Sequence, residues 1–262
     1  MENPVSRWRR PWWLAVIVAV VVMLGGDVPA GASTTSPYSG SGYDVGWPNC
    51  SETPPGGFAI VGLGDGRPFT TSPCLAGEWS TANGYSATPS PALYFNTGYA
   101  GAYGRDVTGS CTDYNGPSLA GLPQHDQSTY DKAWEIGCSE ALYAITTATT
   151  YGETPSMWWA DIETGNSWST NQTVNQYTVD GISYEGKMEK SGLPWGVYSY
   201  AAAWDKLVGS GFTPTPAFEG DWGPGLSCTA TSGSTSGFSG VPVWIVQGNT
   251  TSSGVDTDTG CG

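Results

Sequence analysis

Two acidic residues, Asp161 and Glu163, stand one residue apart at the end of an apolar run in the segment MWWADIETGNSW, residues 157–168. Residues i and i+2 of a strand point to the same face, so we expect both carboxyl groups on one side of a strand. The residues around them are apolar on both faces, which is typical of a strand that is covered on both sides. Two such carboxyl groups could act as an acid and a base, or could bind a cation.

Further acids stand at or near the ends of other predicted strands and could join this pair. They are Asp44, Glu219, Asp221, Asp256 and Asp258. Converging carboxyl groups raise one another's pKa, so one can keep its proton while another is ionised. Glycoside hydrolysis requires that division of roles. A Ca²⁺ or Mg²⁺ site and a set of solvated surface acids are the alternatives.

Other catalytic chemistry has less support in the sequence. The one histidine, His125, lies in a predicted loop, and no G-x-S-x-G motif occurs. We therefore expect no nucleophilic triad, no cofactor and no metal.

The chain contains 13 tryptophans, whose large rigid rings suit the apolar faces of sugars. For any one tryptophan, packing in the core is the alternative, and we expect Trp158 to pack under a helix. The residues expected to contact a substrate lie at or near predicted strand ends. They are Trp47, Asn96, Trp159, Trp168, Tyr198, Asp221, Trp222 and Gln247.

Eight segments are candidates for the strands that would position these residues. They cover 43–47, 58–64, 92–96, 157–163, 195–200, 217–222, 243–247 and 255–258. Helices are predicted over 75–83, 130–150, 172–192 and 201–208. This alternation predicts an α/β fold, a single irregular (β/α)8 TIM-type barrel, in which the carboxyl ends of the strands share one face.

The predicted loop 97–127 is long and rich in glycine, aspartate and tyrosine. Loops of this length inside a compact domain are commonly functional or disordered. Ser128 with Asp131 predicts the start of the helix after it, and Ser169 with Gln172 predicts the start of the next helix.

Six cysteines follow the N-terminal region, and an even number in an exported chain predicts three disulfides. Six cysteines allow 15 pairings, and pairing between sequence neighbours is our prediction. The expected bonds are Cys50–Cys74, Cys111–Cys138 and Cys228–Cys261. A metal site built from these cysteines is the minor alternative.

The first 32 residues have the pattern of a secretory signal peptide, with arginines, an apolar run and the small residues Ala30-Gly31-Ala32. A membrane anchor is the alternative, although the run is shorter than the ~20 residues that span a bilayer. We expect cleavage near residue 32, a flexible lead-in over 33–41 and a barrel domain over 42–262.

Removal of this leader would change the formal net charge from −14 to about −15, because three arginines and two acids are lost. Such a chain is not expected to bind nucleic acid or anionic lipid. A neutral or cationic polysaccharide suits it better. We expect a secreted monomer with no stable membrane insertion.

Three segments carry a family resemblance: GYDVGWPNC at 42–50, WWADIETGNSW at 158–168 and GVDTDTGC at 254–261. Together they resemble a group of secreted actinobacterial proteins that is distantly similar to the family 25 glycoside hydrolases, lysozymes with an irregular α/β barrel. The resemblance implies that Glu163 is the general acid and that Asp161 assists it or stabilises the oxocarbenium-like state. It implies that Asp44 and Asp256 are supporting acids on the rim.

The substrate implied by this resemblance is the peptidoglycan glycan, cut at β-1,4 linkages between N-acetylmuramic acid and N-acetylglucosamine. The sequence departs from the lysozyme pattern in its long loop and its disulfides. It also has Tyr94-Phe95-Asn96 where the family has an aromatic-histidine pair. The alternative is therefore a catalytically silent glycan-binding or cell-envelope protein on the same barrel.

Overall fold

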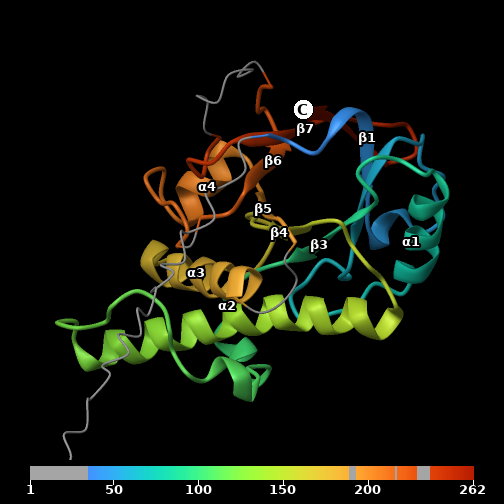
Figure 1. Ribbon diagram of the computed structural model, residues 1–262. Helices are drawn as coiled ribbons and strands as arrows, with labels where there is room; N and C mark the ends of the chain where they lie inside the picture. The colour runs from blue at the N-terminus through green and yellow to red at the C-terminus, as the bar shows by residue number, and fades with distance from the viewer. Residues whose placement is uncertain (1–34, 189–192, 216, 229–236) are drawn as a thin grey trace, which may run out of the picture. The chain divides into compact units, whose positions relative to one another are not determined.

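The eight predicted strands form a closed barrel in which each strand pairs with its neighbour in chain order, so the predicted fold class is confirmed. The computed structural model describes residues 35–188, 193–215, 217–228 and 237–262 (Figure 1). The expected signal peptide and its cleavage site lie outside the described residues. No helix among the described residues is long and apolar enough to cross a membrane.

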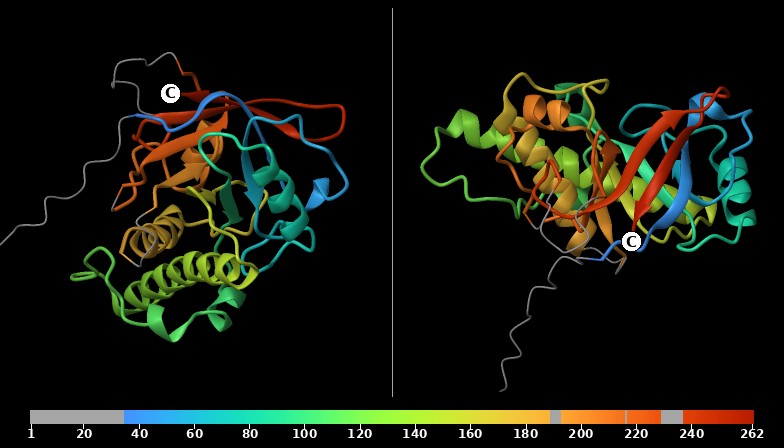
Figure 2. Two further views of the ribbon diagram at one scale, coloured as in Figure 1. Left: turned by 45° about the vertical axis from the view of Figure 1, so that its right-hand side comes forward. Right: turned by 90° about the horizontal axis from the view of Figure 1, so that it is seen from above.

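The strands are short, and the first seven run parallel to one another. They are β1 (Ser39–Val45), β2 (Phe58–Gly62), β3 (Ala92–Asn96), β4 (Trp158–Asp161), β5 (Trp195–Tyr198), β6 (Gly220–Pro224), β7 (Val243–Thr250) and β8 (Asp256–Cys261). The last strand, β8, runs antiparallel to both β7 and β1 and closes the barrel between them. Figure 2 shows β7 and β8 as a ribbon beside β1.

Alternate side chains of each strand face the barrel interior and the surrounding helices. Ile60, Trp159 and Trp222 belong to the interior cluster. Val61 and Trp158 belong to the outer cluster, together with alanines of the helix α2. Both faces of β2 and β4 are therefore buried, which explains why these two segments are almost continuously apolar. The expectation that Trp158 packs under a helix is confirmed.

Four helices cover the outside of the barrel. They are α1 (Leu75–Gly84), α2 (Gln124–Tyr151), α3 (Gln172–Met188) and α4 (Ala201–Leu207). The long helix α2 and the helix α3 lie side by side (Figure 1). A Cβ on Gly137 of α2 would lie 1.8 Å from the Thr178 carbonyl oxygen, and one on Gly181 of α3 would lie 2.1 Å from that of Trp134. The two glycines thus let the helix backbones touch.

The predicted helix starts are wrong at two places. The helix α2 begins at Gln124, so His125 lies in its first turn and not in the loop. Ser128 does not cap this helix, because its hydroxyl donates to the His125 carbonyl within the helix. At the start of α3, Asn171 replaces Ser169 as the capping residue, since its Oδ1 accepts a hydrogen bond from the Thr173 amide.

The three disulfides join the predicted pairs. Between β3 and α2, the long loop contains two short 3-10 turns, η2 (Gly101–Arg105) and η3 (Gly109–Cys111). The bond between Cys111 and Cys138 ties this loop to α2. The expected lead-in is wrong for residues 39–41, which form the start of β1 and follow the fully buried Tyr38.

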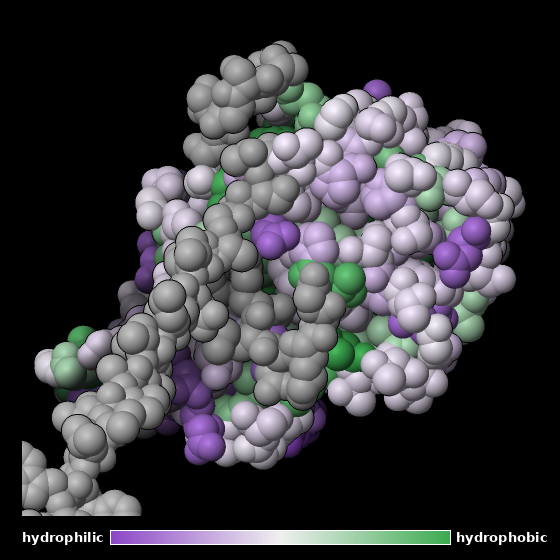
Figure 3. Space-filling view, viewed as in Figure 1, coloured by the Kyte–Doolittle hydropathy of each residue, from purple (hydrophilic) through white to green (hydrophobic). Residues whose placement is uncertain are grey.

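Weakly hydrophilic residues dominate the face of the molecule in Figure 3, where strongly hydrophilic side chains are scattered. This agrees with a chain in which 12% of residues are charged. The described surface offers few basic side chains, and three of them pair with neighbouring acids: Arg67 with Asp65, Arg105 with Asp106 and Lys132 with Glu135.

Candidate active site

Carboxyl groups from three strands come together at the end of the barrel where the parallel strands finish. Asp44 lies near the end of β1, and Asp161 is the last residue of β4. The antiparallel β8 begins at this same end, so Asp256 pairs directly with Asp44. We call Asp44, Asp161, Glu163, Asp256 and Asp258 the acid cluster.

Asp161 and Glu163 are the members of this cluster at the end of β4. The Asp161 carboxyl is almost fully buried, and its Oδ2 accepts a hydrogen bond of 2.5 Å from Asn96 Nδ2. Burial and, second, the Glu163 carboxylate raise the pKa of Asp161 to about 8. Glu163 is more exposed, and its pKa is raised by burial and by Asp256. The two groups therefore hold a proton between them near neutral pH.

The chain after β4 is held in place by hydrogen bonds. The Ile162 amide donates to the Tyr198 carbonyl over 2.8 Å. The indole Nε1 of Trp168 donates over 2.8 Å to the Glu163 carbonyl, which closes the turn that follows. Glu163 lies just beyond the strand and not within it as predicted, but these bonds fix its backbone.

Asp258, one of the strand-end acids that could join the pair, belongs to the acid cluster, although the sequence assigns it no role there. It is 2% exposed, and its Oδ1 accepts a hydrogen bond of 3.0 Å from Trp222 Nε1. Burial raises its pKa to about 7, and Asp256 adds to this effect. Burial also raises the pKa of Asp44 well above its usual range, with Asp258 as the strongest charged contributor. Asp256 and Asp258 have the same i, i+2 spacing as Asp161 and Glu163. This spacing is the signal in the sequence that could have identified Asp258 as a site residue.

Tyr198, Gln247 and Asp256 lie at the same end of the barrel. The Tyr198 hydroxyl donates to Gln247 Oε1. Burial raises the pKa of Tyr198, and the nearby carboxylates raise it further, Glu163 first. Asp256 Oδ1 accepts a hydrogen bond of 2.5 Å from the Thr250 hydroxyl.

Of the tryptophans expected to contact a substrate, two are buried in the barrel. Trp159 is fully buried, and its Nε1 donates to the Tyr38 hydroxyl over 3.3 Å. It lies two residues before Asp161, so it packs beneath that carboxyl in the interior. Trp222 is buried as well and packs against Tyr198. Both predictions are wrong in this structure, because neither ring presents a face to solvent.

The other two tryptophans are partly accessible. Trp47 lies in the 3-10 turn η1 (Trp47–Asn49) after β1, and 45% of it is exposed. Its Nε1 donates to the Asp65 carbonyl, which fixes the plane of the ring. Trp168 is half-buried.

Asp221 lies outside the acid cluster, contrary to the prediction. It alternates with Trp222 on β6, so it points out of the barrel while Trp222 points in. It is fully buried there, and its Oδ1 accepts a hydrogen bond of 2.5 Å from the Ser239 hydroxyl. Glu219 precedes β6 and lies at the opposite end of that strand from the acid cluster.

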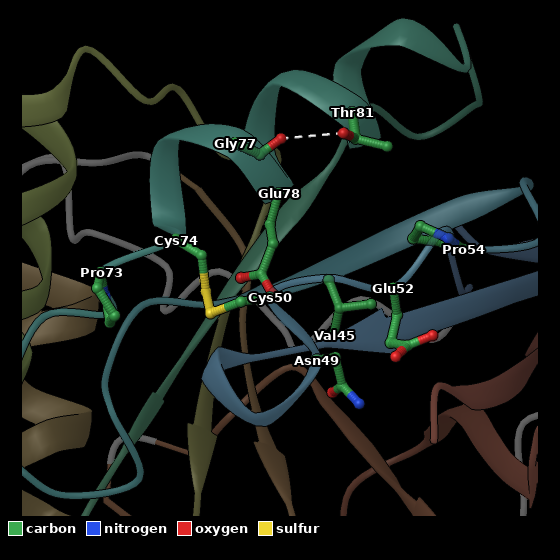
Figure 4. Close-up of a pocket in the computed structure, with 10 residues that line it drawn as sticks. All are labelled: Val45, Asn49, Cys50, Glu52, Pro54, Pro73, Cys74, Gly77, Glu78 and Thr81. Carbon is green, nitrogen blue, oxygen red and sulfur yellow. Dashed lines mark hydrogen bonds between the residues drawn. A yellow bond between two sulfur atoms is a disulfide. The ribbon is translucent and has the colours of Figure 1, made fainter. Parts of the chain in front are cut away.

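Potential metal ligands gather elsewhere in the described part of the chain. Two groups of three side chains have ligand atoms within 4.8 Å, and each includes a disulfide whose sulfurs cannot act as thiolates. Figure 4 shows one of them, Cys50 and Cys74 with Glu78, in a pocket of about 350 Å³ between α1 and the end of β1. Burial raises the pKa of Glu78 to about 7, so this carboxyl keeps a proton in weakly acidic solution.

No protein-family model and no curated protein sequence matches the chain. Two solved structures are similar to it, both of the modular autolysin LytC from Streptococcus pneumoniae, one of them in complex with a synthetic peptidoglycan ligand. In each, the identity is 11%, the TM-score is 0.47, and the match covers 83% of this chain and 46% of LytC. The chain thus spans about half the length of the LytC structures it matches.

Proposed function

We propose that this chain is a secreted glycoside hydrolase, related to the family 25 lysozymes, that cleaves β-1,4 linkages in the glycan strands of peptidoglycan. The observation that supports this most is the pair formed by Asp161 and Glu163. One carboxyl is buried and retains its proton up to about pH 8, while the other is more exposed beside it. Glycoside hydrolysis needs one protonated and one ionised carboxyl group at the reacting bond.

In this proposal Glu163 is the general acid, because it is the more exposed of the two and can reach a glycosidic oxygen. The proton that the pair shares is delivered through Glu163 to the leaving oxygen. Asp161, held by Asn96, then supplies negative charge beside the oxocarbenium-like centre. Asp44 on β1 and Asp256 on β8 support this charge distribution.

Trp47 and Trp168 supply ring surface to the glycan, with Asn96, Tyr198 and Gln247 as polar contacts. The three disulfides support an oxidising compartment outside the cytoplasm. We propose that the chain acts there as a monomer without inserting into a membrane.

The second candidate is a glycan-binding protein without catalysis. The exposed ring of Trp47 favours it, since a fixed aromatic face at the rim can hold a sugar in the absence of any reaction.

The test compares the wild-type protein with Glu163→Gln and with a matched control, Asp221→Asn, which removes a buried acid outside the acid cluster. Each is incubated with purified peptidoglycan, and released reducing ends are measured. We expect activity in the wild type and in the control, and a loss of about 10²–10⁴-fold in Glu163→Gln. Background release from all three proteins would refute the hydrolase. Co-sedimentation with insoluble peptidoglycan would then support the binding protein.

A further inference from the structure

We propose that Asp258 is a positioning residue that fixes the Asp44 carboxyl through one proton shared between the two side chains. This inference rests on the proposed function for its role in catalysis, but the shared proton itself can be tested without any activity.

The geometry brings these two acids together from adjacent strands. β8 runs antiparallel to β1, and Asp258 pairs with Gly42, two residues before Asp44. Asp258 accepts a hydrogen bond from Trp222 of the interior cluster, so its carboxyl lies on the interior side of β8. Tyr43 and Val45 on either side of Asp44 belong to the outer cluster, so Asp44 also points to the interior. The Asp44 side chain lowers the pKa of Asp258, as expected if a hydrogen bond from a protonated Asp44 joins the two carboxyl groups. Two carboxyl groups can form such a bond only if one of them carries a proton.

The remaining partners place that proton on Asp44. Asp258 Oδ1 already accepts a hydrogen bond from Trp222 Nε1, which stabilises negative charge on Asp258. The Oδ2 atoms of both acids are buried, and no other group in the described ranges donates to either. Asp258 is therefore the acceptor and Asp44 the donor, so the pair carries one negative charge near neutral pH.

The groups that face this pair are acids and tyrosines. They are Asp256 on β8, Asp161 and Glu163 at the end of β4, Tyr94 on β3, Tyr198 on β5 and Tyr38 before β1. No lysine, arginine or histidine of the described chain is among the groups whose charge acts on Asp44 or Asp258. Without a cation nearby, a shared proton is what relieves the repulsion between the carboxylates.

This arrangement has a consequence for the proposed reaction. A neutral Asp44 does not repel a negative charge on Asp161 or Glu163, and the bond to Asp258 holds the Asp44 carboxyl in one orientation. Asp258 itself acts only through Asp44.

The experiment is a carboxyl ¹³C NMR titration of the full chain labelled at the aspartate side chains. The Asp44 signal is identified by its disappearance in Asp44→Asn. The test variant is Asp258→Asn, whose amide can still accept from Trp222 and can donate to Asp44. In this variant, we expect the titration midpoint of Asp44 to fall by at least about one pH unit. The control Asp221→Asn should leave it unchanged.

A second variant, Trp222→Phe, keeps both acids and removes the hydrogen bond that stabilises charge on Asp258. We expect the Asp258 midpoint to rise in it. If the Asp44 midpoint is the same in Asp258→Asn as in the wild type, or the Asp258 midpoint does not rise in Trp222→Phe, the shared proton is refuted.

If peptidoglycan hydrolysis is observed, its pH profile should move in Asp258→Asn and not in Asp221→Asn. A protein that shows the NMR shifts but releases no reducing ends would refute the proposed function and leave the shared proton standing.

Discussion

Burial keeps a proton on the Asp161 carboxyl at pH values where an exposed aspartate is ionised. Its pKa of about 8 in the folded chain compares with about 3.9 for an unfolded aspartate. The unfolded chain thus gives up this proton at a lower pH than the folded chain. The contribution of protonated Asp161 to the free energy of unfolding is therefore fully present below about pH 4. It is lost as the pH rises through about 8.

Asp161→Asn should remove this loss, because an asparagine has no proton to give up and its Oδ1 can still accept from Asn96. We compare the difference in Tm between the variant and the wild type at pH 4 and at pH 8. We expect this difference to be at least about 4 °C larger, in favour of the variant, at pH 8. Thermal unfolding at each pH measures this. The exposed Asp113→Asn is the control, and an equal rise in both variants would contradict the assignment of the effect to burial.

For single residues, the sequence predicts which acids form pairs better than it predicts whether a side chain points into the barrel. The i, i+2 spacing correctly places Asp161 and Glu163 on one side of the chain. The same reasoning does not show which alternate set of a strand faces inward, so it predicts both Asp221 and its neighbour Trp222 at the site. That choice depends on the register of β6 in the barrel, which is determined by strands distant in the sequence.

Among the elements, the crossing of α2 and α3 depends on two glycines. Gly137→Ala should lower the stability by about 1–3 kcal/mol or more, because its Cβ would lie 1.8 Å from the Thr178 carbonyl oxygen and the helices must move apart. Gly77→Ala in the exposed part of α1 is the matched control. Its Cβ would have no atom within 4 Å, so we expect a gain of about 0.5–1 kcal/mol.

Urea unfolding of both variants measures these changes. Equal effects at the two sites would mean that the close approach of α2 and α3 is not needed for stability.

Strands such as β2 could be predicted from their continuous apolar runs, whereas the helix starts could not be predicted as well. Ser128 and Asp131 are typical of a helix start, yet α2 begins at Gln124. The aromatic cluster of Tyr130, Trp134 and Tyr177 packs around this part of α2 and favours a longer helix. Tertiary packing here outweighs the local signal.

The antiparallel direction of β8 can also be predicted from the sequence. Residues 251–255 form a short connection between β7 and β8, and parallel strands require a crossover of a dozen residues or more. A hairpin, with β8 antiparallel, follows from that length alone.

For the molecule as a whole, the net charge of −14 determines which polymers it can approach. The basic residues Arg67, Arg105 and Lys132 are each paired with an acid, so they offer little attraction to phosphate or sulfate groups. We expect no retention on DNA or heparin at about 50 mM salt, where such attraction is strong. Mobility-shift and column assays measure this, with a basic protein as the positive control. Binding to DNA at micromolar concentration would contradict the charge argument.

The position of β8 has a consequence for the order in which the site is assembled. The chain is synthesised from its N-terminus, so β1 to β7 emerge before β8. Yet β8 closes the barrel and contributes Asp256 and Asp258. The site therefore stays incomplete during synthesis until about residue 261 has emerged. This delay follows from the topology, because a chain that is only partly synthesised has Asp161 and Glu163 but lacks the strand that completes the cluster around them.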